Sequence, residues 1–344
     1  MKKGRILSGM RPTGKLHLGH LIGALDNWVK LQDEYECFYE VAIWHALTDH
    51  LDTKNFQEDI YDMVRDWLAA GLDPKKSVMF IQSDVPEHAE LHLLLSMLTP
   101  VPWLERCTTF KEKIKDMHIG KGDVSYGLLG YPVLQAADIL IYKANVVPVG
   151  EDQLPHLELT REIARRFNYY YGRVGLHDRV GLHDNIFPEP RALLTSTAKL
   201  LGLDGRTKMS KSYDNYISLG DSAKEIQSKV QTMFTDPKRI KLKDSGHPES
   251  CNVYSYHKVF SSNEICPTLM GDCRQARIGC TECKKNLAKY IEKFLAPFQE
   301  RQRKWKKDSI KVILDEGARK ARAVAQATME EVRKAMKIKK GDDL

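Results

Sequence analysis

Two histidines stand three positions apart near the start of the chain, in Gly14-Lys-Leu-His17-Leu-Gly19-His20. The segment follows a short apolar run and begins a stretch with helical periodicity, so we expect His17 and His20 on one side of a first helical turn. The amino end of a helix offers free N–H groups and partial positive charge to phosphate, and Gly19 leaves a flat surface for an adenine ring. We predict that both imidazoles contact a nucleotide. Two surface histidines at a helix start are the alternative.

A second polar segment, Lys208-Met209-Ser210-Lys211-Ser212, follows a glycine-led turn in the second half of the chain. Two lysines and two serines in five residues can close over a polyphosphate, because ammonium and hydroxyl groups donate hydrogen bonds to phosphate oxygens. We predict that Lys208 and Lys211 bind phosphate groups. Taken alone, the segment is also compatible with an ordinary basic loop.

Five of the seven cysteines fall in one short region of the second half. They are Cys251, Cys266, Cys273, Cys280 and Cys283. A Cys-x-x-Cys pair with further cysteines upstream is typical of zinc or of an iron–sulfur cluster held by thiolates. Cysteines that pack between helices without a ligand are the alternative.

The pattern of the chain indicates which elements position these groups. Apolar runs at 5–8, 38–43 and 77–82 alternate with helical patterns at 21–32 and 56–70. Strands that alternate with helices predict an α/β, Rossmann-like parallel sheet over residues 1–213, with ligands at the carboxyl ends of its strands. Helical patterns at 222–234, 283–298, 310–316 and 319–337 predict an all-helical C-terminal domain over 214–344.

Composition and charge limit the class of protein. With 344 residues, 42% hydrophobic and 29% charged, the chain reads as a two-domain globular protein. No apolar run approaches the ~18 residues of a membrane span and no signal-peptide core is evident, so we expect a cytoplasmic protein without membrane contact. Residues 301–344 carry 14 basic and 7 acidic side chains, which accounts for the whole net charge of +7. This basic end favours a nucleic-acid partner, with a solvated helix face as the alternative.

One segment is duplicated: residues 173–178, Arg-Val-Gly-Leu-His-Asp, are repeated at 179–184. We interpret the repeat as an insertion in an exposed loop without functional weight.

Together, His-Leu-Gly-His and Lys-Met-Ser-Lys-Ser resemble the paired signatures of class I aminoacyl-tRNA synthetases. The segments Arg11-Pro-Thr-Gly14, Tyr131 to Leu140 and Val147 to Gln153 are similar to the tryptophanyl-tRNA synthetase family of bacterial type, over nearly the whole chain. The resemblance implies ATP-dependent activation of L-tryptophan to tryptophanyl-adenylate, transfer to the tryptophan tRNA, Mg²⁺ bound with ATP, and a homodimer. A tyrosyl-tRNA synthetase and a catalytically silent RNA-binding paralogue are the alternatives.

One carboxylate is singled out by its helix face. Tyr131, Gln135, Asp138 and Tyr142 recur at helical spacing among apolar residues, and a buried carboxylate needs a donor such as an indole N–H. The resemblance implies that Asp138 reads the indole nitrogen. A carboxylate paired with an arginine on a helix surface is the alternative.

The resemblance also implies the remaining binding residues. His17, His20, Lys208 and Lys211 are implied as catalytic. Residues implied for ATP are Arg11, Pro12, Thr13, Gly19, His20, Gly150, Glu151, Asp152, Lys208, Met209, Ser210, Lys211 and Ser212. Residues implied for tryptophan are Leu7, His45, Tyr131, Gln135, Asp138, Ile139, Val147, Val149 and Gln153.

Some members of this family carry a [4Fe–4S] cluster in a similar cysteine pattern, which ranks that cluster above zinc. By this resemblance the ligands are Cys251, Cys273, Cys280 and Cys283. The spacing departs from the family pattern by one residue, so Cys266 is a rival for the first ligand.

Overall fold

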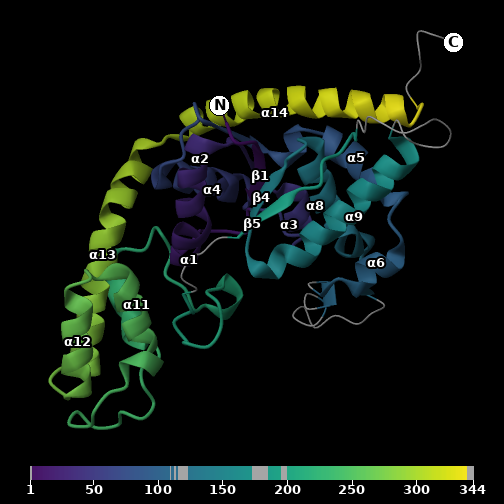
Figure 1. Ribbon diagram of the computed structural model, residues 1–344. Helices are drawn as coiled ribbons and strands as arrows, with labels where there is room; N and C mark the ends of the chain where they lie inside the picture. Colours follow the sequence, from purple (N-terminus) through teal and green to yellow (C-terminus); the bar gives the residue numbers. More distant parts are fainter. Residues whose placement is uncertain are drawn as a thin grey trace.

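A five-stranded sheet forms the centre of the larger part of the molecule (Figure 1). The computed structural model describes residues 2–108, 110–111, 114, 123–172, 185–194 and 200–338, with Ser212 described for its backbone alone. The strands are β1 (Arg5–Met10), β2 (Glu36–Val41), β3 (Ser77–Ile81), β4 (Val146–Val149) and β5 (Arg191–Leu194). They lie in the order β3-β2-β1-β4-β5, and every neighbouring pair is parallel. The order reverses between β1 and β4, so the crevice at their carboxyl ends is where such a sheet binds ligands.

Helices connect the strands and cover the sheet, which confirms the predicted α/β class. They are α1 (Leu18–His20), the π-helical turn η1 (Leu21–Leu25), α2 (Asp26–Glu34), α3 (Ile43–Leu47), α4 (Phe56–Ala70), η2 (Gln82–Asp84), α5 (Glu87–Ser96), α6 (Val101–Arg106), α8 (Tyr126–Ile141), η4 (Glu151–Gln153) and α9 (Leu154–Tyr171). The predicted strand at 38–43 ends earlier than expected, because Ile43 already begins α3. The duplicated segment at 173–184 lies outside the described residues.

The second half of the chain is helical, as predicted; within its described part, no strand follows β5. Its elements are η5 (Lys211–Tyr213), α10 (Ala223–Thr232), η6 (Pro248–Ser250), α11 (Asn252–Phe260), α12 (Ile265–Arg274), α13 (Cys280–Lys304) and α14 (Lys307–Ala335). The two helices predicted at 310–316 and 319–337 are wrong as separate elements, since α14 runs through both. No helix among the described residues has the length and apolarity needed to cross a membrane.

Helix α14 returns from the helical half and runs across the sheet half, next to β3 and α5 (Figure 1). Its Arg322 Nε donates to Glu87 Oε1 on α5 at 2.9 Å, and Arg333 Nε donates to Glu90 Oε1 at 2.7 Å. Two of the basic side chains in residues 301–344 therefore pair with acidic side chains of the sheet half. Buried residues of both halves, such as Ile6 and Leu287, belong to one hydrophobic cluster, while the boundary at residue 213 stays a prediction.

Gly317 lets α14 approach the sheet. A Cβ at this position would lie 1.7 Å from the carbonyl oxygen of Met79 in β3. We expect Gly317→Ala to lower the free energy of unfolding by about 1–3 kcal/mol, because the whole helix must shift. Gly23→Ala is the matched control: its Cβ would meet nothing within 4 Å, and a gain of about 0.5–1 kcal/mol is expected there. Chemical denaturation of both variants measures the difference, and equal effects would contradict this account of the packing.

Asp66 of α4 is buried where α13 packs against it, and Gln302 Nε2 donates to its Oδ1 at 2.5 Å. Burial raises the pKa of Asp66 to about 7, although the hydrogen bond from Gln302 opposes the rise. The folded protein therefore holds a proton that the unfolded chain, with a pKa of about 4, has released, so stability falls as pH rises from about 4 to about 7.

We expect Asp66→Asn to raise the melting temperature at pH 8 and to give no gain at pH 4, since asparagine cannot ionise and still accepts from Gln302. Thermal melts at both pH values measure this. Asp33→Asn is the control, because Asp33 is an exposed partner of Lys76 and should show no such gain. An Asp66→Asn gain equal at the two pH values would rule out ionisation as its cause.

Candidate active site

His17 is the residue just before α1 and His20 is the last residue of α1, so both lie in the first turn of a helical run that continues through η1 and α2. Leu18 N donates to Ile217 O at 3.0 Å, which ties this turn to the segment that follows the basic loop. The ring centroids of His17 and His20 are 3.8 Å apart. Burial lowers the pKa of His17 to about 4 and that of His20 well below its ordinary value, with nearby positive charge adding to both shifts. Both imidazoles are neutral at pH 7 and each can donate one N–H to a phosphate oxygen.

The basic loop is held by a residue that the sequence analysis missed. Asn215 is buried, accepts from Ser210 N at 2.7 Å and donates to Lys208 O at 3.2 Å. It also donates to Thr207 Oγ1 at 2.8 Å. The sequence does offer a hint, because Asn215 comes just after Lys208–Ser212 and an asparagine side chain can hydrogen-bond to nearby backbone.

The loop reaches two other segments that the sequence analysis selected. Lys211 Nζ donates to Thr13 O at 2.8 Å, and Lys208 Nζ lies 3.6 Å from Asp152 Oδ2. Burial lowers the pKa of Lys211 to about 8, with Asp59 acting in the opposite direction. Met209 is buried beside Gly19, where a Cβ would lie 3.6 Å from its sulfur. The structure thus brings the two motifs together.

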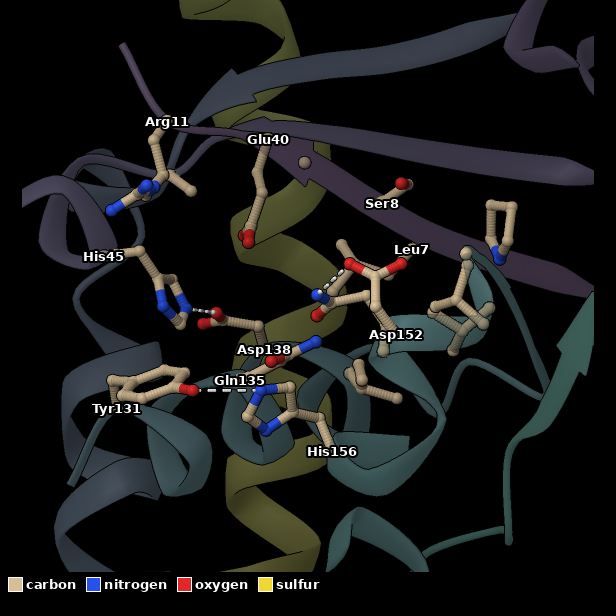
Figure 2. A pocket seen from close by; sticks show the side chains of 18 residues that line it. Leu7, Ser8, Arg11, Glu40, His45, Tyr131, Gln135, Asp138, Asp152 and His156 are labelled. Atoms are coloured by element: carbon tan, nitrogen blue, oxygen red, sulfur yellow. Dashed lines mark hydrogen bonds and ion pairs between the residues drawn. The ribbon is translucent and has the colours of Figure 1, made fainter. Parts of the chain in front are cut away.

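A cavity of about 490 Å³ opens at the carboxyl ends of β1, β2 and β4 (Figure 2). It is lined by all nine residues predicted for the amino acid: Leu7, His45, Tyr131, Gln135, Asp138, Ile139, Val147, Val149 and Gln153. Arg11, Gly150 and Asp152, predicted for ATP, line it as well. His17, His20, Lys208 and Lys211 are not among its lining residues. Of these four, Lys208 contacts the lining, because its Nζ lies 3.6 Å from Asp152 Oδ2.

Asp138 lies in this cavity with 1% of its surface exposed. His45 Nε2 lies 2.6 Å from its Oδ2, while Gln82 Nε2 at 2.9 Å and His88 Nδ1 at 2.6 Å contact its Oδ1. Burial alone would raise the pKa of Asp138, but the hydrogen bonds from His45 and His88 outweigh it and hold the carboxyl ionised. A carboxylate has about four acceptor positions, so Oδ2 can accept one more donor. The alternative of an arginine-paired surface carboxylate is wrong.

The comparisons with known proteins agree with this geometry. Residues 1–296 match the family described as tRNA synthetases class I (W and Y). The chain belongs to this family. It is 54% identical to the tryptophan–tRNA ligase of Thermotoga maritima, over 97% of this chain and 99% of that protein. It is 47% identical to the tryptophan–tRNA ligase of Aquifex aeolicus, over 97% and 100%.

Among solved structures, the tryptophanyl-tRNA synthetase of Campylobacter jejuni, complexed with ADP and tryptophan, superimposes with a TM-score of 0.84. The two sequences are 33% identical, and the match covers 97% of this chain and 99% of the Campylobacter chain. The tryptophanyl branch that the sequence predicted for this class I synthetase is confirmed by these relatives.

The sequence analysis of this class I synthetase did not select His88 and His156, because each contacts the site from a separate element. Tyr131 OH lies 3.0 Å from His156 Nε2, and His88 Nε2 lies 2.7 Å from Tyr142 OH. Tyr142, predicted on the same face as Asp138, therefore supports His88 and does not line the cavity. No local pattern marks His88 or His156, because their partners are distant in sequence.

Four of the synthetase's cysteines line one small cavity in the helical half: Cys251, Cys273, Cys280 and Cys283. Cys266 is not part of this lining, and its Sγ donates to His257 O at 3.3 Å. Burial raises the pKa of Cys283 to about 12, and the other three sulfurs add to the rise. Of the two rivals for the first ligand, Cys251 is the one that faces the others.

Proposed function

We propose that the chain activates L-tryptophan with ATP and transfers it to the terminal ribose of the tryptophan tRNA. The observation that carries this is Asp138, a buried carboxylate with three donors in place and room for one more, inside the cavity lined by all nine predicted residues. An indole N–H is a donor without acceptor capacity and suits that position. The names of the relatives support the same substrate.

In the first step, a carboxylate oxygen of tryptophan bonds to the α-phosphorus of ATP. The bond from that phosphorus to the oxygen bridging to the β-phosphate breaks, and pyrophosphate leaves with the electron pair. Charge builds on the phosphoryl oxygens, so catalysis rests on positioning and on cations aimed at that charge. We assign Lys208 and Lys211 to the pyrophosphate, and His17 and His20 to phosphate and adenosine as neutral donors. Mg²⁺ would be bound mainly by the phosphate oxygens of ATP and by water, so we assign it no protein ligand.

The other assignments follow the two parts of the site. For ATP we propose Arg11, Pro12, Thr13, Gly19, Gly150, Glu151, Asp152, Met209, Ser210 and Ser212. For tryptophan we propose the nine residues that line the cavity.

The test is exchange of labelled pyrophosphate into ATP, with tryptophan and with tyrosine in parallel. Exchange with tryptophan alone is expected. Exchange with tyrosine alone would identify a tyrosine enzyme, and exchange with neither would favour a silent RNA-binding protein.

We also propose a [4Fe–4S] cluster on Cys251, Cys273, Cys280 and Cys283, with zinc as the alternative. A single tetrahedral zinc with Zn–S bonds near 2.3 Å would hold its sulfurs about 3.8 Å apart. Among the cysteines, all of which the structure describes, no three sulfurs lie within 4.8 Å of one another, which supports the larger group. We assign it a bracing role between α11, α12 and α13, away from the cavity that binds tryptophan.

The cluster prediction is checked on anaerobically purified protein by iron, sulfide and zinc analysis. We expect Cys273→Ser to lose the metal while Cys266→Ser, the matched control outside the cavity, retains it. Loss of metal from both variants alike, or stoichiometric metal in neither variant nor the parent protein, would contradict the assignment.

Exposed apolar side chains bear on the oligomeric state. Leu93 of α5, Met97 just after α5, Val101 of α6 and Tyr126 of α8 are all at least half exposed, which supports the homodimer. Sedimentation of the purified chain tests it. We further propose a cytoplasmic location and the tryptophan tRNA as the partner of the helical half.

A further inference from the structure

Glu40 is a carboxyl group in the substrate cavity that the reaction described above does not use. It stands on β2, in register with Gly9 of β1. A Cβ on Gly9 would lie 2.5 Å from Glu40 Cγ, so the glycine makes room for this side chain. Glu40 is 4% exposed and lines the same cavity as Asp138 (Figure 2).

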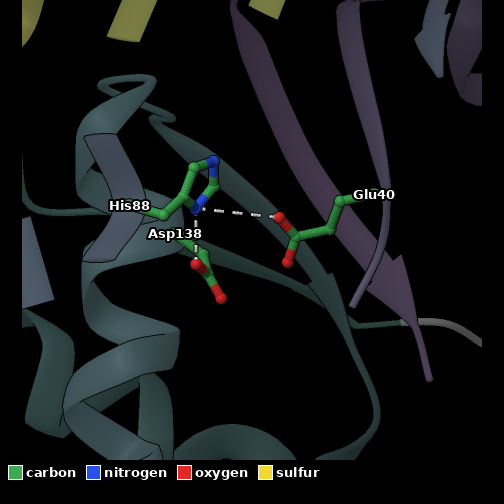
Figure 3. Close-up of side chains that lie close together, drawn as sticks. All are labelled: Glu40, His88 and Asp138. Atoms are coloured by element: carbon green, nitrogen blue, oxygen red, sulfur yellow. Dashed lines mark hydrogen bonds and ion pairs between the residues drawn. The ribbon is translucent and has the colours of Figure 1, made fainter. Parts of the chain in front are cut away.

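One carboxyl oxygen of Glu40 has no hydrogen-bond partner. Its Oε2 lies 4.0 Å from His88 Nδ1, which already contacts Asp138 Oδ1 at 2.6 Å (Figure 3). One oxygen of Glu40, one oxygen of Asp138 and one ring nitrogen of His88 all lie within 4.8 Å of one another. A buried polar atom without a partner costs free energy, and the last torsion of a glutamate turns easily. A ligand in the cavity can therefore supply the missing partner.

The protonation of Glu40 decides what it can bind. Burial, the negative charge of Asp138 and the side-chain hydrogen-bond interaction with Asp138 all raise the pKa of Glu40 well above its ordinary range. Asp138 stays ionised because two histidines contact it. Of the two carboxyl groups, Glu40 is therefore the one that carries a proton. A neutral carboxyl both donates and accepts a hydrogen bond.

We propose that Glu40 is a second reader of the indole ring, and that it makes the enzyme prefer tryptophan analogues with a ring nitrogen beside the N–H over isomers that carry the nitrogen elsewhere in the ring. The inference rests on the proposed function, in which Asp138 accepts the indole N–H. A hydrogen bond spans about 2.9 Å, and one Glu40 oxygen lies within 4.8 Å of one of the two Asp138 oxygens. Ring positions 2 and 7 flank the N–H, so a nitrogen at one of them comes within reach of the Glu40 O–H.

Azatryptophans test this without a change of ring size. Pyrophosphate exchange is measured with tryptophan and with 2-aza-, 7-aza- and 4-azatryptophan, and kcat/KM is expressed relative to tryptophan. We expect the 2-aza or the 7-aza isomer to exceed the 4-aza isomer by about tenfold, because position 4 lies on the far edge of the ring. Equal values for the three isomers would overturn the proposal, and this measurement needs only the unaltered protein.

Two variants locate the effect at Glu40. Glu40→Met keeps the unbranched stem that passes Gly9 but removes the donor, and the preferred isomer should lose about tenfold relative to tryptophan in the same variant. Glu40→Gln retains a donor and should keep most of the preference. The same preference in both variants would assign it to another group. If the unaltered protein showed no pyrophosphate exchange with tryptophan, the proposed function itself would be refuted. Failure of the Glu40 proposal is therefore distinguishable from failure of the proposed function.

Discussion

Replacing Lys211 with alanine is expected to lower the rate of tryptophan-dependent pyrophosphate exchange by about 10²- to 10³-fold. The Lys211 ammonium is held at Thr13 O, 2.8 Å away, and is partly withdrawn from water. A charge fixed in advance in such surroundings stabilises the phosphoryl charge that develops in the transition state. Exchange kinetics at saturating tryptophan and ATP measure the effect.

Lys208→Ala is the matched control in the same loop. The Lys208 side chain is 72% exposed and lies 3.6 Å from Asp152 Oδ2, so water already screens its charge and a loss nearer tenfold is expected. A Lys208→Ala loss as large as that of Lys211→Ala would show that burial of the ammonium is not what matters.

The pH dependence gives an independent check on Lys211. Its pKa is lowered to about 8, and only the protonated form can stabilise phosphate charge. In the unliganded enzyme Lys211 is therefore protonated well below pH 8, half protonated at about pH 8 and neutral well above it, so kcat/KM for ATP should fall through that range. Lys211→Arg keeps its charge and should move that fall to higher pH. A profile that is the same in both proteins would assign the ionisation to another group.

The sequence could predict the parts of the site that one segment supplies. His17 and His20 share one helical turn, and Tyr131, Gln135 and Asp138 share one face of α8, so local periodicity could group them. It grouped Tyr142 with them as well, and the binding roles came from the resemblance to the family. Gln82 and His88, which complete the surroundings of Asp138, come from η2 and α5. Their contacts exist only after the sheet has formed, and no periodicity marks them.

The same limit applies to the helical half. Spacing could not choose between Cys251 and Cys266, because both precede the Cys-x-x-Cys pair. The choice depends on packing: Cys251 is next to η6 and faces the cavity, whereas Cys266 is in α12 and turns to His257. The return of α14 depends likewise on one glycine that meets the backbone of β3.

Asp138→Asn is expected to lower kcat/KM for tryptophan by about 10²- to 10³-fold and to reduce discrimination against phenylalanine. Three donors surround Asp138, on both of its oxygens. Either orientation of the asparagine amide turns its N–H₂ toward at least one of them, which leaves buried donors without an acceptor. The variant also loses the charge that accepts the indole N–H.

Phenylalanine has no ring N–H, so its use depends less on that oxygen, and the ratio of the two kcat/KM values isolates the recognition of indole. Asp152→Asn is the control, because Asp152 is a second carboxylate in the cavity that lies beside Lys208. It should change ATP kinetics and leave the ratio unaltered. If Asp138→Asn also left the ratio unaltered, the hydrogen bonds that hold Asp138 would serve folding alone, and tryptophan would be selected by the shape of the cavity.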